Sequence, residues 1–348
     1  MLSKTIQEDL DRIINHKLDW NVFANSTVLI SGAAGFLPAY MVETLLRLND
    51  IYNSHIKVIA LVRSEEKALK RFSHYKGRPD LELLIQDVCV PVNLPAISQI
   101  DYIIHAASHA SPKFYGQDPV GTISPNIIGT TNLLNLAKEK STRGFLFFSS
   151  GEVYGETKEG QIPTKESDYG YMDPMNVRSC YGESKRMGET LCVSWQHQYG
   201  IPVKIVRPFH TYGPGMSLND GRVFADFVSD IVNNRDIVMK SEGTNTRAFC
   251  YIADAVLGFF TVLLEGDIGE AYNVGFDKET SIIELANTLA GLFPEKRLRV
   301  IRNEDAVGSG FIKNPIVRTC PDISKIKALG WEPKTELITG FKRTIMSY

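Results

Sequence analysis

A tyrosine and a lysine four residues apart carry the clearest chemical pattern in this chain. Tyr181 and Lys185 lie within the stretch 178–189, and residues four apart on a helix share one face. An ammonium beside a phenol favours the phenolate, so we expect the pKa of Tyr181 to fall toward neutrality. A tyrosine tuned in this way removes a hydroxyl proton at neutral pH. The alternative is a surface tyrosine beside a solvated lysine.

Two further polar side chains follow a strand that is predicted over residues 145–148. Ser150 and Glu152 come just after this strand, and the active sites of open parallel sheets lie at the carboxyl ends of strands. A carboxylate buried without a partner is costly, so Glu152 at this place indicates chemistry, whereas Ser150 could also cap a turn. The candidate catalytic residues are therefore Ser150, Glu152, Tyr181 and Lys185.

A glycine-containing turn follows the first predicted strand, over residues 26–31. Gly32 permits a tight turn, and Gly35 lets the backbone approach a pyrophosphate at a helix N-terminus. The spacing is G-x-x-G, and Pro38 stands where a third glycine would fall. The pattern predicts a dinucleotide site that includes Phe36 and Leu37 at the start of the following helix.

Other strand ends supply the remaining candidate cofactor contacts. The strand over 57–63 lacks the usual acid for the ribose hydroxyls and ends in Arg63, which could instead bind a 2′-phosphate. NAD is therefore the expected cofactor and NADP an alternative, although Arg63 could equally face solvent. Small residues after the strand over 101–104 would let a cofactor lie across its end. The further candidates are Asp87, Val88, Ala106, Ala107, Ser108 and Pro208.

Strands and helices alternate through the first part of the chain, with a helix expected over 119–138 and a strand over 203–206. This alternation predicts an α/β fold with a Rossmann-type, doubly wound parallel sheet. We expect residues 1–25 to form an amphipathic helical extension that packs on the protein's own body rather than on a partner. Residues 26–208 mainly form the dinucleotide-binding domain. Residues 209–348 mainly form a smaller, mixed α/β substrate-binding region, from which the chain returns to the first domain.

Composition excludes several classes of protein. The chain has 348 residues, 43% of them hydrophobic and 22% charged, with a net charge of −2, which argues against binding nucleic acid or acidic membranes. The longest apolar run, 255–264, is too short to span a bilayer. The five cysteines show no C-x-x-C spacing, and His105 and His109 have no neighbouring ligand cluster, so we expect no metal. An acidic N-terminus is wrong for a signal peptide, and we expect a cytoplasmic protein.

Taken in order, the motifs resemble those of the extended short-chain dehydrogenase/reductases that modify nucleoside-diphosphate sugars. The resemblance covers nearly all of residues 26–345. It rests on Gly32-x-x-Gly35, Ser150, Tyr181-x-x-x-Lys185, Arg207-Pro208, Tyr212-Gly213-Pro214, Thr246 to Phe249 and Pro321 to Lys325. Within that family the best local match is UDP-glucuronate decarboxylase, through residues 110–115, 126–130, 152–155, 176–186 and 220–223.

The resemblance implies a recycled nicotinamide cofactor and a transient 4-keto sugar. Tyr181 would take the proton from the sugar 4-hydroxyl, Lys185 would lower the tyrosine pKa and hold the nicotinamide ribose, and Ser150 would bond the same sugar oxygen. Glu152 would orient a carboxylated substrate or act as a base at C5. The substrate-binding residues would be Ser111, Pro112, Tyr115, His210, Arg222, Arg247 and Arg318. A homodimer is expected, through a helix bundle that includes residues 181–198.

Departures from the decarboxylase pattern leave the reaction open. The arginine expected two residues before Pro321 is replaced by Thr319, with Arg318 one residue further away. His210 replaces an asparagine, and Gly151 stands where related dehydratases place an aspartate acid. Decarboxylation is the leading interpretation, with 4-epimerisation and 4,6-dehydration as alternatives. A protein that binds the dinucleotide without turnover is the alternative of another class, although it would be expected to have lost Ser150, Tyr181 or Lys185.

Overall fold

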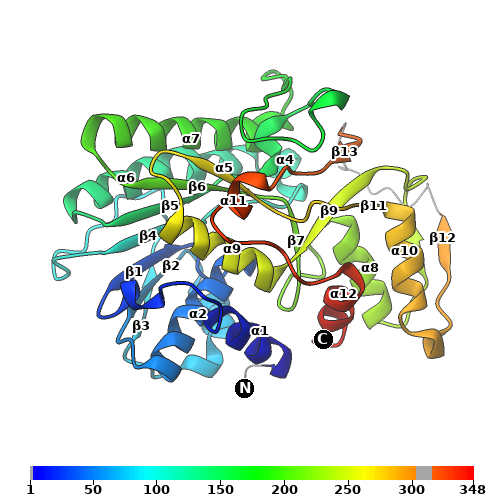
Figure 1. The fold of residues 1–348 in the computed structure, drawn as a ribbon, viewed down its shortest axis with the longest axis horizontal. Helices are drawn as coiled ribbons and strands as arrows, with labels where there is room; N and C mark the ends of the chain where they lie inside the picture. Colours follow the sequence, from blue (N-terminus) through cyan, green and yellow to red (C-terminus); the bar gives the residue numbers. More distant parts are fainter. Residues whose placement is uncertain (1–2, 303–315) are drawn as a thin grey trace.

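A parallel sheet of seven strands is the largest element of the computed structural model, which describes residues 3–302 and 316–348 (Figure 1). The strand order is β3-β2-β1-β4-β5-β6-β10, and every pair is parallel. The strands are β1 (Thr27–Ser31), β2 (Lys57–Val62), β3 (Leu81–Ile85), β4 (Tyr102–His105), β5 (Gly144–Phe148), β6 (Val203–Pro208) and β10 (Ala271–Val274). The central strands are buried along almost their whole length, as expected for parallel strands covered on both faces.

Helices cover both faces of this sheet (Figure 1). One layer contains α1 (Lys4–Ile14), α2 (Phe36–Tyr52) and α9 (Ile252–Glu265), and the other contains α5 (Pro119–Ser124), α6 (Thr130–Glu139) and α7 (Ser179–Tyr199). The short helices α3 (Glu65–Arg71), α4 (Lys113–Gln117) and α11 (Ser324–Lys327) lie in the connections. The predicted doubly wound architecture is therefore confirmed.

The helix expected over 119–138 is not continuous. A π-helical segment, Pro125–Gly129, separates α5 from α6. Pro125 has no backbone N–H to donate within a helix, and a π segment accommodates the irregularity at this point. The break places Asn126 in the core, where its side-chain amide donates to Ser184 Oγ of α7 at 2.9 Å.

A smaller region follows β6 in sequence and lies beside the carboxyl ends of the large sheet (Figure 1). Its sheet contains β7 (His210–Tyr212), β9 (Thr246–Tyr251), β11 (Glu279–Ser281) and β13 (Arg318–Thr319). A two-stranded sheet pairs β8 (Ile237–Met239) with β12 (Val300–Arg302), and the helices are α8 (Val223–Val232), α10 (Ile282–Gly291) and α12 (Leu337–Ile345). Strand β10 belongs to this stretch of sequence but pairs with β6 in the large sheet.

The N-terminal helix α1 packs against the rest of the chain. Ile6, Leu10, Ile13 and Ile14 are buried in the main hydrophobic core. On the same helix the Asp9 carboxylate accepts hydrogen bonds from the Tyr251 hydroxyl at 2.7 Å and from Arg343 at 2.9 Å. Both chain ends therefore meet on one side of the molecule, as Figure 1 shows for α1 and α12.

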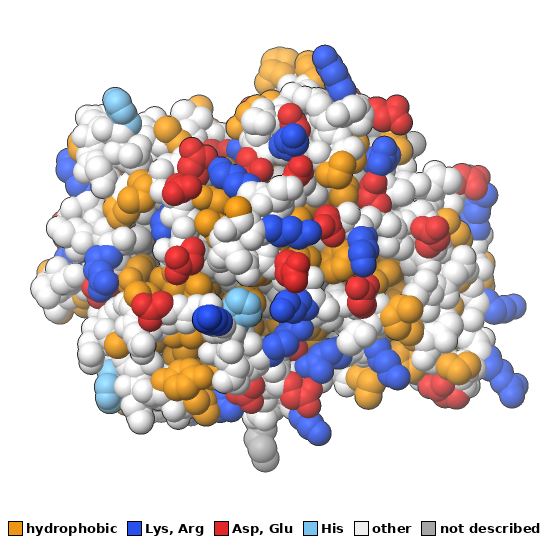
Figure 2. All heavy atoms as spheres, viewed as in Figure 1, with side chains coloured by type: hydrophobic (Ala, Val, Ile, Leu, Met, Phe, Trp, Pro, Cys, Tyr) orange, Lys and Arg blue, Asp and Glu red, His pale blue; other side chains and the backbone are white. Residues whose placement is uncertain are grey.

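Acidic and basic side chains alternate over the face shown in Figure 2, with small apolar areas between them. Mixed charge of this kind keeps a surface solvated without creating a field of one sign. Among the described residues no helix is long and apolar enough to cross a membrane.

Candidate active site

Helix α7 packs closely against strand β5 at Gly188. A Cβ on Gly188 would collide with the Phe147 ring and would lie 3.2 Å from the Asn126 carbonyl oxygen, so a glycine is needed for this approach. One turn earlier on the helix, Lys185 Nζ donates to the Phe148 carbonyl oxygen at 2.5 Å. The helix thereby places the face that carries Lys185 at the carboxyl end of β5, just before Ser150.

Tyr181 lies on the same face of α7 and is 6% exposed. Burial raises the pKa of Tyr181 to about 12, whereas its hydrogen bond with the Ser150 side chain and the charge of Arg222 favour the phenolate. The spacing of Tyr181 and Lys185 predicted a lowered pKa for the tyrosine. That prediction is wrong for the protein without bound ligands. The cost of desolvating the buried phenolate exceeds the stabilisation by the hydrogen bond and the positive charge.

Lys185 is buried as deeply as the tyrosine. Burial lowers the pKa of Lys185 to about 7, and the carboxylate of Glu189 opposes this change. The ammonium lies 5.8 Å from the centre of the Tyr181 ring and 5.1 Å from that of Phe147. At neutral pH the charge of this lysine therefore depends on its surroundings.

Tyr115 stacks on Tyr181 with ring centres 5.1 Å apart and planes inclined by 13°. Tyr115 is one of the predicted substrate-binding residues, and its segment also contacts the loop before α8. Ser111 Oγ donates to the Asp220 carbonyl oxygen, and Pro112 precedes α4 directly. The segment 111–115 and the loop around Arg222 thus meet beside the tyrosine pair.

Glu152 makes a bidentate ion pair with Arg178, a residue to which the sequence assigned no role. Arg178 Nη1 and Nη2 lie 3.0 and 3.2 Å from the two carboxylate oxygens. The side chains of Arg178 and Glu152 are 12% and 26% exposed, and the guanidinium lies 5.4 Å from the centre of the Tyr115 ring. A signal for Arg178 was present, since it directly precedes the helix that carries Tyr181.

Two other arginines lie within electrostatic range of this group. Arg247 is buried, which lowers its pKa, while the charge of Glu152 raises it; its guanidinium donates to the carbonyl oxygens of Ile316 and Val317 at 2.8 and 2.9 Å. Arg222 is ion-paired with Asp220. A substrate bound here would therefore meet more positive than negative side chains.

His210 pairs in register with Phe249 on the neighbouring strand β9. Burial and the charges of Arg247 and Arg222 lower the pKa of His210 far below its usual value, so the ring is neutral. Its Nδ1 is buried without a hydrogen-bond partner among the described residues.

Arg318 lies on the face of the small sheet opposite to that of Arg247. In register, Arg318 pairs with Thr246, and Thr319 pairs with Arg247, so successive residues of β13 point to opposite faces. Arg318 forms an ion pair with Glu279 at 2.6 Å, and Thr319 takes the side that Arg247 shares. The offset of one residue noted in the sequence therefore reverses the direction of the side chain, and the structure does not bring Arg318 to Tyr181.

The glycine turn after β1 makes a cradle at the centre of the large sheet. Gly32 has φ of +68°, and a Cβ there would lie 2.7 Å from Ala107 Cα. The backbone N–H groups of Ala106 and Ala107 donate to Ser31 Oγ, both at 3.2 Å. Ser108 Oγ is buried without a partner among the described residues. Close backbone approach and an unpaired hydroxyl fit the binding of a dinucleotide.

The other predicted cofactor residues surround this turn. Phe36 and Leu37 begin α2, whose N-terminus is capped by Gly35 without a side-chain hydrogen bond. Asp87 uses its carboxylate to accept from the Cys89 N–H at 2.8 Å, and the Arg63 guanidinium lies 3.1 Å from His109 Nε2. A Cβ on Gly129 would lie 2.8 Å from Val88 Cγ1, so Val88 leaves no room for a side chain there, and Pro208 ends β6.

No group of metal-binding side chains is found in residues 3–302 and 316–348. His105 is committed to other bonds: its Nδ1 lies 2.7 Å from Ser31 Oγ and its Nε2 lies 3.1 Å from Thr130 Oγ1. Burial lowers the pKa of His105 to about 3, so this histidine is a neutral part of the core.

Residues 28–275 match the model of the NAD dependent epimerase/dehydratase family. The chain belongs to this family. It is 37% identical over 319 residues to UDP-glucuronic acid decarboxylase 6 of Arabidopsis thaliana, covering 91% of this chain and 87% of that protein. It is 34% identical over 319 residues to UDP-glucuronic acid decarboxylase 1 of Xenopus tropicalis, covering 91% and 71%. The family expected from the ordered motifs is confirmed, and the chain is an enzyme of the NAD-dependent group.

Solved structures of this family share the fold at lower identity. UDP-glucuronic acid 4-epimerase from Bacillus cereus, in complex with UDP-glucuronic acid and NAD, superposes with a TM-score of 0.77 at 24% identity, covering 92% of this chain and 98% of the epimerase. dTDP-glucose 4,6-dehydratase from Bacillus anthracis gives a TM-score of 0.75 at 20% identity, covering 93% and 96%. The fold is thus common to family members with different reactions, and the reaction must be argued from the site.

Proposed function

We propose that this enzyme oxidises C4 of a nucleoside-diphosphate hexuronate and then releases the C6 carboxylate as CO2, with UDP-glucuronate as the leading substrate. The observation that carries the proposal is the Glu152–Arg178 pair beside the Tyr181–Tyr115 stack. A guanidinium fork binds carboxylates in a bidentate manner. The names of the curated relatives support the same substrate.

The cofactor fits the turn after β1. Gly32, the N-terminus of α2 and the small residues 106–108 would hold the dinucleotide, and Lys185 would hold its nicotinamide ribose. When bound, NAD supplies a hydride acceptor for the first step and a hydride donor for the last. NAD is preferred to NADP because Arg63 already contacts His109.

Tyr181 removes the proton from the sugar 4-hydroxyl. Its pKa, raised to about 12 by burial, makes the phenolate scarce at neutral pH. Ser150 and the positive charges of Arg222 and Lys185 must therefore stabilise it as the proton moves. Ser150 bonds the same sugar oxygen and stabilises the charge that develops on it.

The resulting 4-keto sugar is a β-keto acid. The bond between C5 and C6 breaks, its electron pair moves toward the C4 oxygen, and CO2 leaves. Tyr181 and Ser150 stabilise the enolate oxygen by hydrogen bonding. A proton then adds to C5, hydride returns to C4, and the pentose is formed. We assign to Arg178 the orientation of the substrate carboxylate, and to Glu152 the position of that arginine.

A second candidate is 4-epimerisation, which one specific observation favours. Thr319 lies on the face shared with Arg247, where a decarboxylase is expected to have arginine. An uncharged side chain there would not promote loss of the carboxylate. The 4-keto sugar could then rotate and accept hydride on its other face.

Packing disfavours a 4,6-dehydration in which an aspartate at position 151 acts as the acid. A Cβ on Gly151 would lie 3.1 Å from the Phe209 ring, so the ring occupies the space into which an acid at this position would extend. Loss of water would therefore need a proton donor from another residue.

The product mass tests the proposal. Purified protein with NAD is incubated with UDP-glucuronate, and the nucleotide sugar is measured by mass spectrometry, with UDP-glucose as a second substrate and Tyr181→Phe as the matched control. Loss of CO2 that Tyr181→Phe abolishes supports the decarboxylase. Unchanged mass with a new chromatographic peak would establish epimerisation. No conversion of UDP-glucuronate would reject both.

We also propose a homodimer in the cytoplasm. Exposed apolar side chains on α7, including Met187 and Val193, support pairing through this helix. Among the described residues the five cysteines are all free, which fits a reducing compartment. Light scattering at micromolar concentration tests the dimer: twice the chain mass is expected, and a monomer would contradict it.

A further inference from the structure

A second arginine–glutamate pair lies behind the catalytic residues. Arg207 Nε donates to Glu189 Oε1 at 2.8 Å, and Nη2 donates to Oε2 at 2.6 Å. The two side chains are 2% and 13% exposed. Glu189 follows Lys185 by one turn of α7, and Arg207 lies near the end of β6. The pair therefore joins the catalytic helix to the sheet.

The Arg207 guanidinium has an acceptor for each of its five N–H groups. Besides the two oxygens of Glu189, it donates from Nη1 to the Tyr154 hydroxyl at 2.9 Å and to the Glu166 carbonyl oxygen at 2.8 Å. Its Nη2 also donates to the Tyr169 hydroxyl at 3.1 Å. Only arginine offers five donors in this geometry, so its orientation, and with it that of the carboxylate, is fixed.

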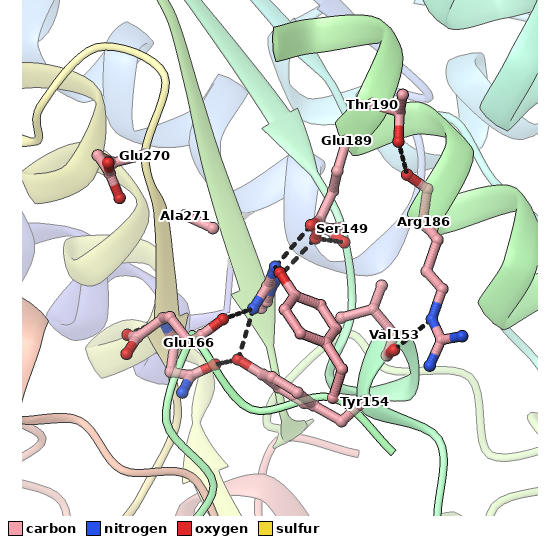
Figure 3. A network of polar contacts seen from close by, with 12 residues as sticks. Ser149, Val153, Tyr154, Glu166, Arg186, Glu189, Thr190, Glu270 and Ala271 are labelled. Carbon is pink, nitrogen blue, oxygen red and sulfur yellow. Dashed lines mark hydrogen bonds and ion pairs between the residues drawn. The ribbon is translucent and has the colours of Figure 1, made fainter. Parts of the chain in front are cut away.

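The same carboxylate also contacts the end of β5. Ser149 Oγ donates to Glu189 Oε1, and Figure 3 shows Ser149 and Glu189 pointing toward each other. The Ser149 N–H donates to the Val206 carbonyl oxygen at 2.8 Å, which ties this point to β6. Because Ser149 precedes Ser150 in the chain, the Glu189 contact sets the position from which Ser150 reaches Tyr181.

Glu189 is also the carboxylate that acts on the buried ammonium of Lys185. The titratable groups around Lys185 are Tyr181, Glu189 and Cys192 on α7 and His105 on β4. Burial keeps Tyr181, Cys192 and His105 uncharged at neutral pH. Glu189 therefore supplies the negative charge that counters desolvation of the lysine.

A cavity of about 580 Å³ borders the pair on the side of β6 and β10, with Glu189, Arg207 and Ala271 among its lining residues. In Figure 3, Glu270 and Ala271 lie across from Glu189. Without the hold of Arg207, the Glu189 carboxylate could turn into this space and away from Lys185.

We propose that Glu189 is a positioning residue for the oxidation step, held by Arg207, which keeps Lys185 charged and fixes the relation of Ser150 to Tyr181. The inference rests on the C4 oxidation of the proposed function, but it does not depend on the subsequent chemistry at C5. Neither Glu189 nor Arg207 touches the reacting atoms, so both act through the catalytic side chains rather than on the substrate.

The pH profile of turnover is the first test. In Glu189→Gln the shape of the side chain is kept and its charge removed, so Lys185 loses its proton at lower pH. We expect the descending basic limb of kcat/KM to shift down by about one pH unit, and kcat to fall more than tenfold with little change in KM. Glu183→Gln, on the same helix but in a half-exposed pair with Arg186, is the control and should leave the profile unchanged.

Two further variants separate charge from folding. Glu189→Asp keeps the charge and should retain the basic limb of the wild-type profile even if kcat falls. The double variant Glu189→Gln/Arg207→Gln leaves no unpaired charge behind, and it should still show the shifted limb. An unshifted limb in a folded Glu189→Gln or double variant would overturn the proposal.

Thermal melting tests the same charge without turnover. In the folded wild type the pKa of Lys185 is about 7, below that of the unfolded chain, so stability rises with pH above this value. In Glu189→Gln the pKa of Lys185 in the folded state is lower, so stability begins to rise at a lower pH than in the wild type. The difference in Tm between wild type and variant should therefore narrow as pH increases from about 6 to about 9. A constant gap would contradict the inference, even if UDP-glucuronate proves not to be a substrate.

Discussion

The two arginine–glutamate pairs around helix α7 have the same chemistry and different surroundings. Glu152–Arg178 lies beside the tyrosine stack and keeps partial contact with solvent, whereas Glu189–Arg207 is enclosed between the helix and the sheet. Among the residues that the structure describes, the first guanidinium has donors without an acceptor, whereas the second has an acceptor for each. The difference in burial therefore suits the Glu152–Arg178 pair to substrate recognition and the Glu189–Arg207 pair to positioning other side chains.

Arg207→Met should produce the largest loss. Removing one partner of a buried pair leaves the other charge unpaired, so we expect the free energy of unfolding to fall by about 3–5 kcal/mol. Chemical denaturation followed by circular dichroism measures this change. A loss as small as that of Arg178→Met would show that the two pairs do not differ in the way their burial indicates.

Arg178→Met should lower activity much more than stability. Glu152 remains partly solvated, so we expect a loss of about 1 kcal/mol in stability. Since one charged hydrogen-bonding partner of the substrate carboxylate is removed, kcat/KM for UDP-glucuronate should fall by about tenfold to a hundredfold. Inhibition by UDP-glucose, which lacks the carboxylate, serves as the control and should be little changed. Equal losses for both ligands would argue against recognition of the carboxylate.

Glu152→Gln sharpens the comparison further. The amide can keep one hydrogen bond to Arg178 but not the ion pair, so kcat should fall by about tenfold, while Tm stays close to that of the wild type. The gap in Tm between this variant and the wild type should not change with pH, in contrast to that of Glu189→Gln. Melting curves recorded across the pH range for both variants make the test, and a narrowing gap for Glu152→Gln would remove the distinction.

Arg318→Ala should have the smallest effect. Arg318 pairs with Glu279 near the surface of the small sheet, and surface ion pairs contribute up to about 1 kcal/mol. We expect kcat/KM for UDP-glucuronate to remain within about twofold of the wild type, because such a pair contributes little. A loss as large as that of Arg178→Met would show that Arg318 reaches the substrate.

The sequence predicted those parts of the site that depend on local order. The spacing of Tyr181 and Lys185 put both on one face of α7, and the strand over 145–148 put Ser150 at a carboxyl end. The turn at Gly32 followed from residue type alone, since its φ of +68° suits glycine. The sheet and its helices followed from alternating elements in the same way.

Other features of the site depend on contacts between residues far apart in the sequence, which no local pattern predicts. Glu152 and Arg178 are 26 positions apart, and a lone arginine before a helix gives no sign of its partner. The direction of Arg318 depends on the register of β13 with β9. The pKa of Tyr181 is raised by burial, which outweighs the hydrogen bond from Ser150 and the charge of Arg222. Proximity in sequence therefore predicted which candidate catalytic residues lie together but not their electrostatics.

Release of labelled CO2 from UDP-glucuronate that carries an isotope at C6 tests the proposed reaction most directly. The wild-type enzyme with NAD should release the label, Tyr181→Phe should not, and Arg178→Met should release it slowly while remaining folded. Retention of the label in a nucleotide sugar that has changed its configuration at C4 would contradict decarboxylation and establish the epimerase.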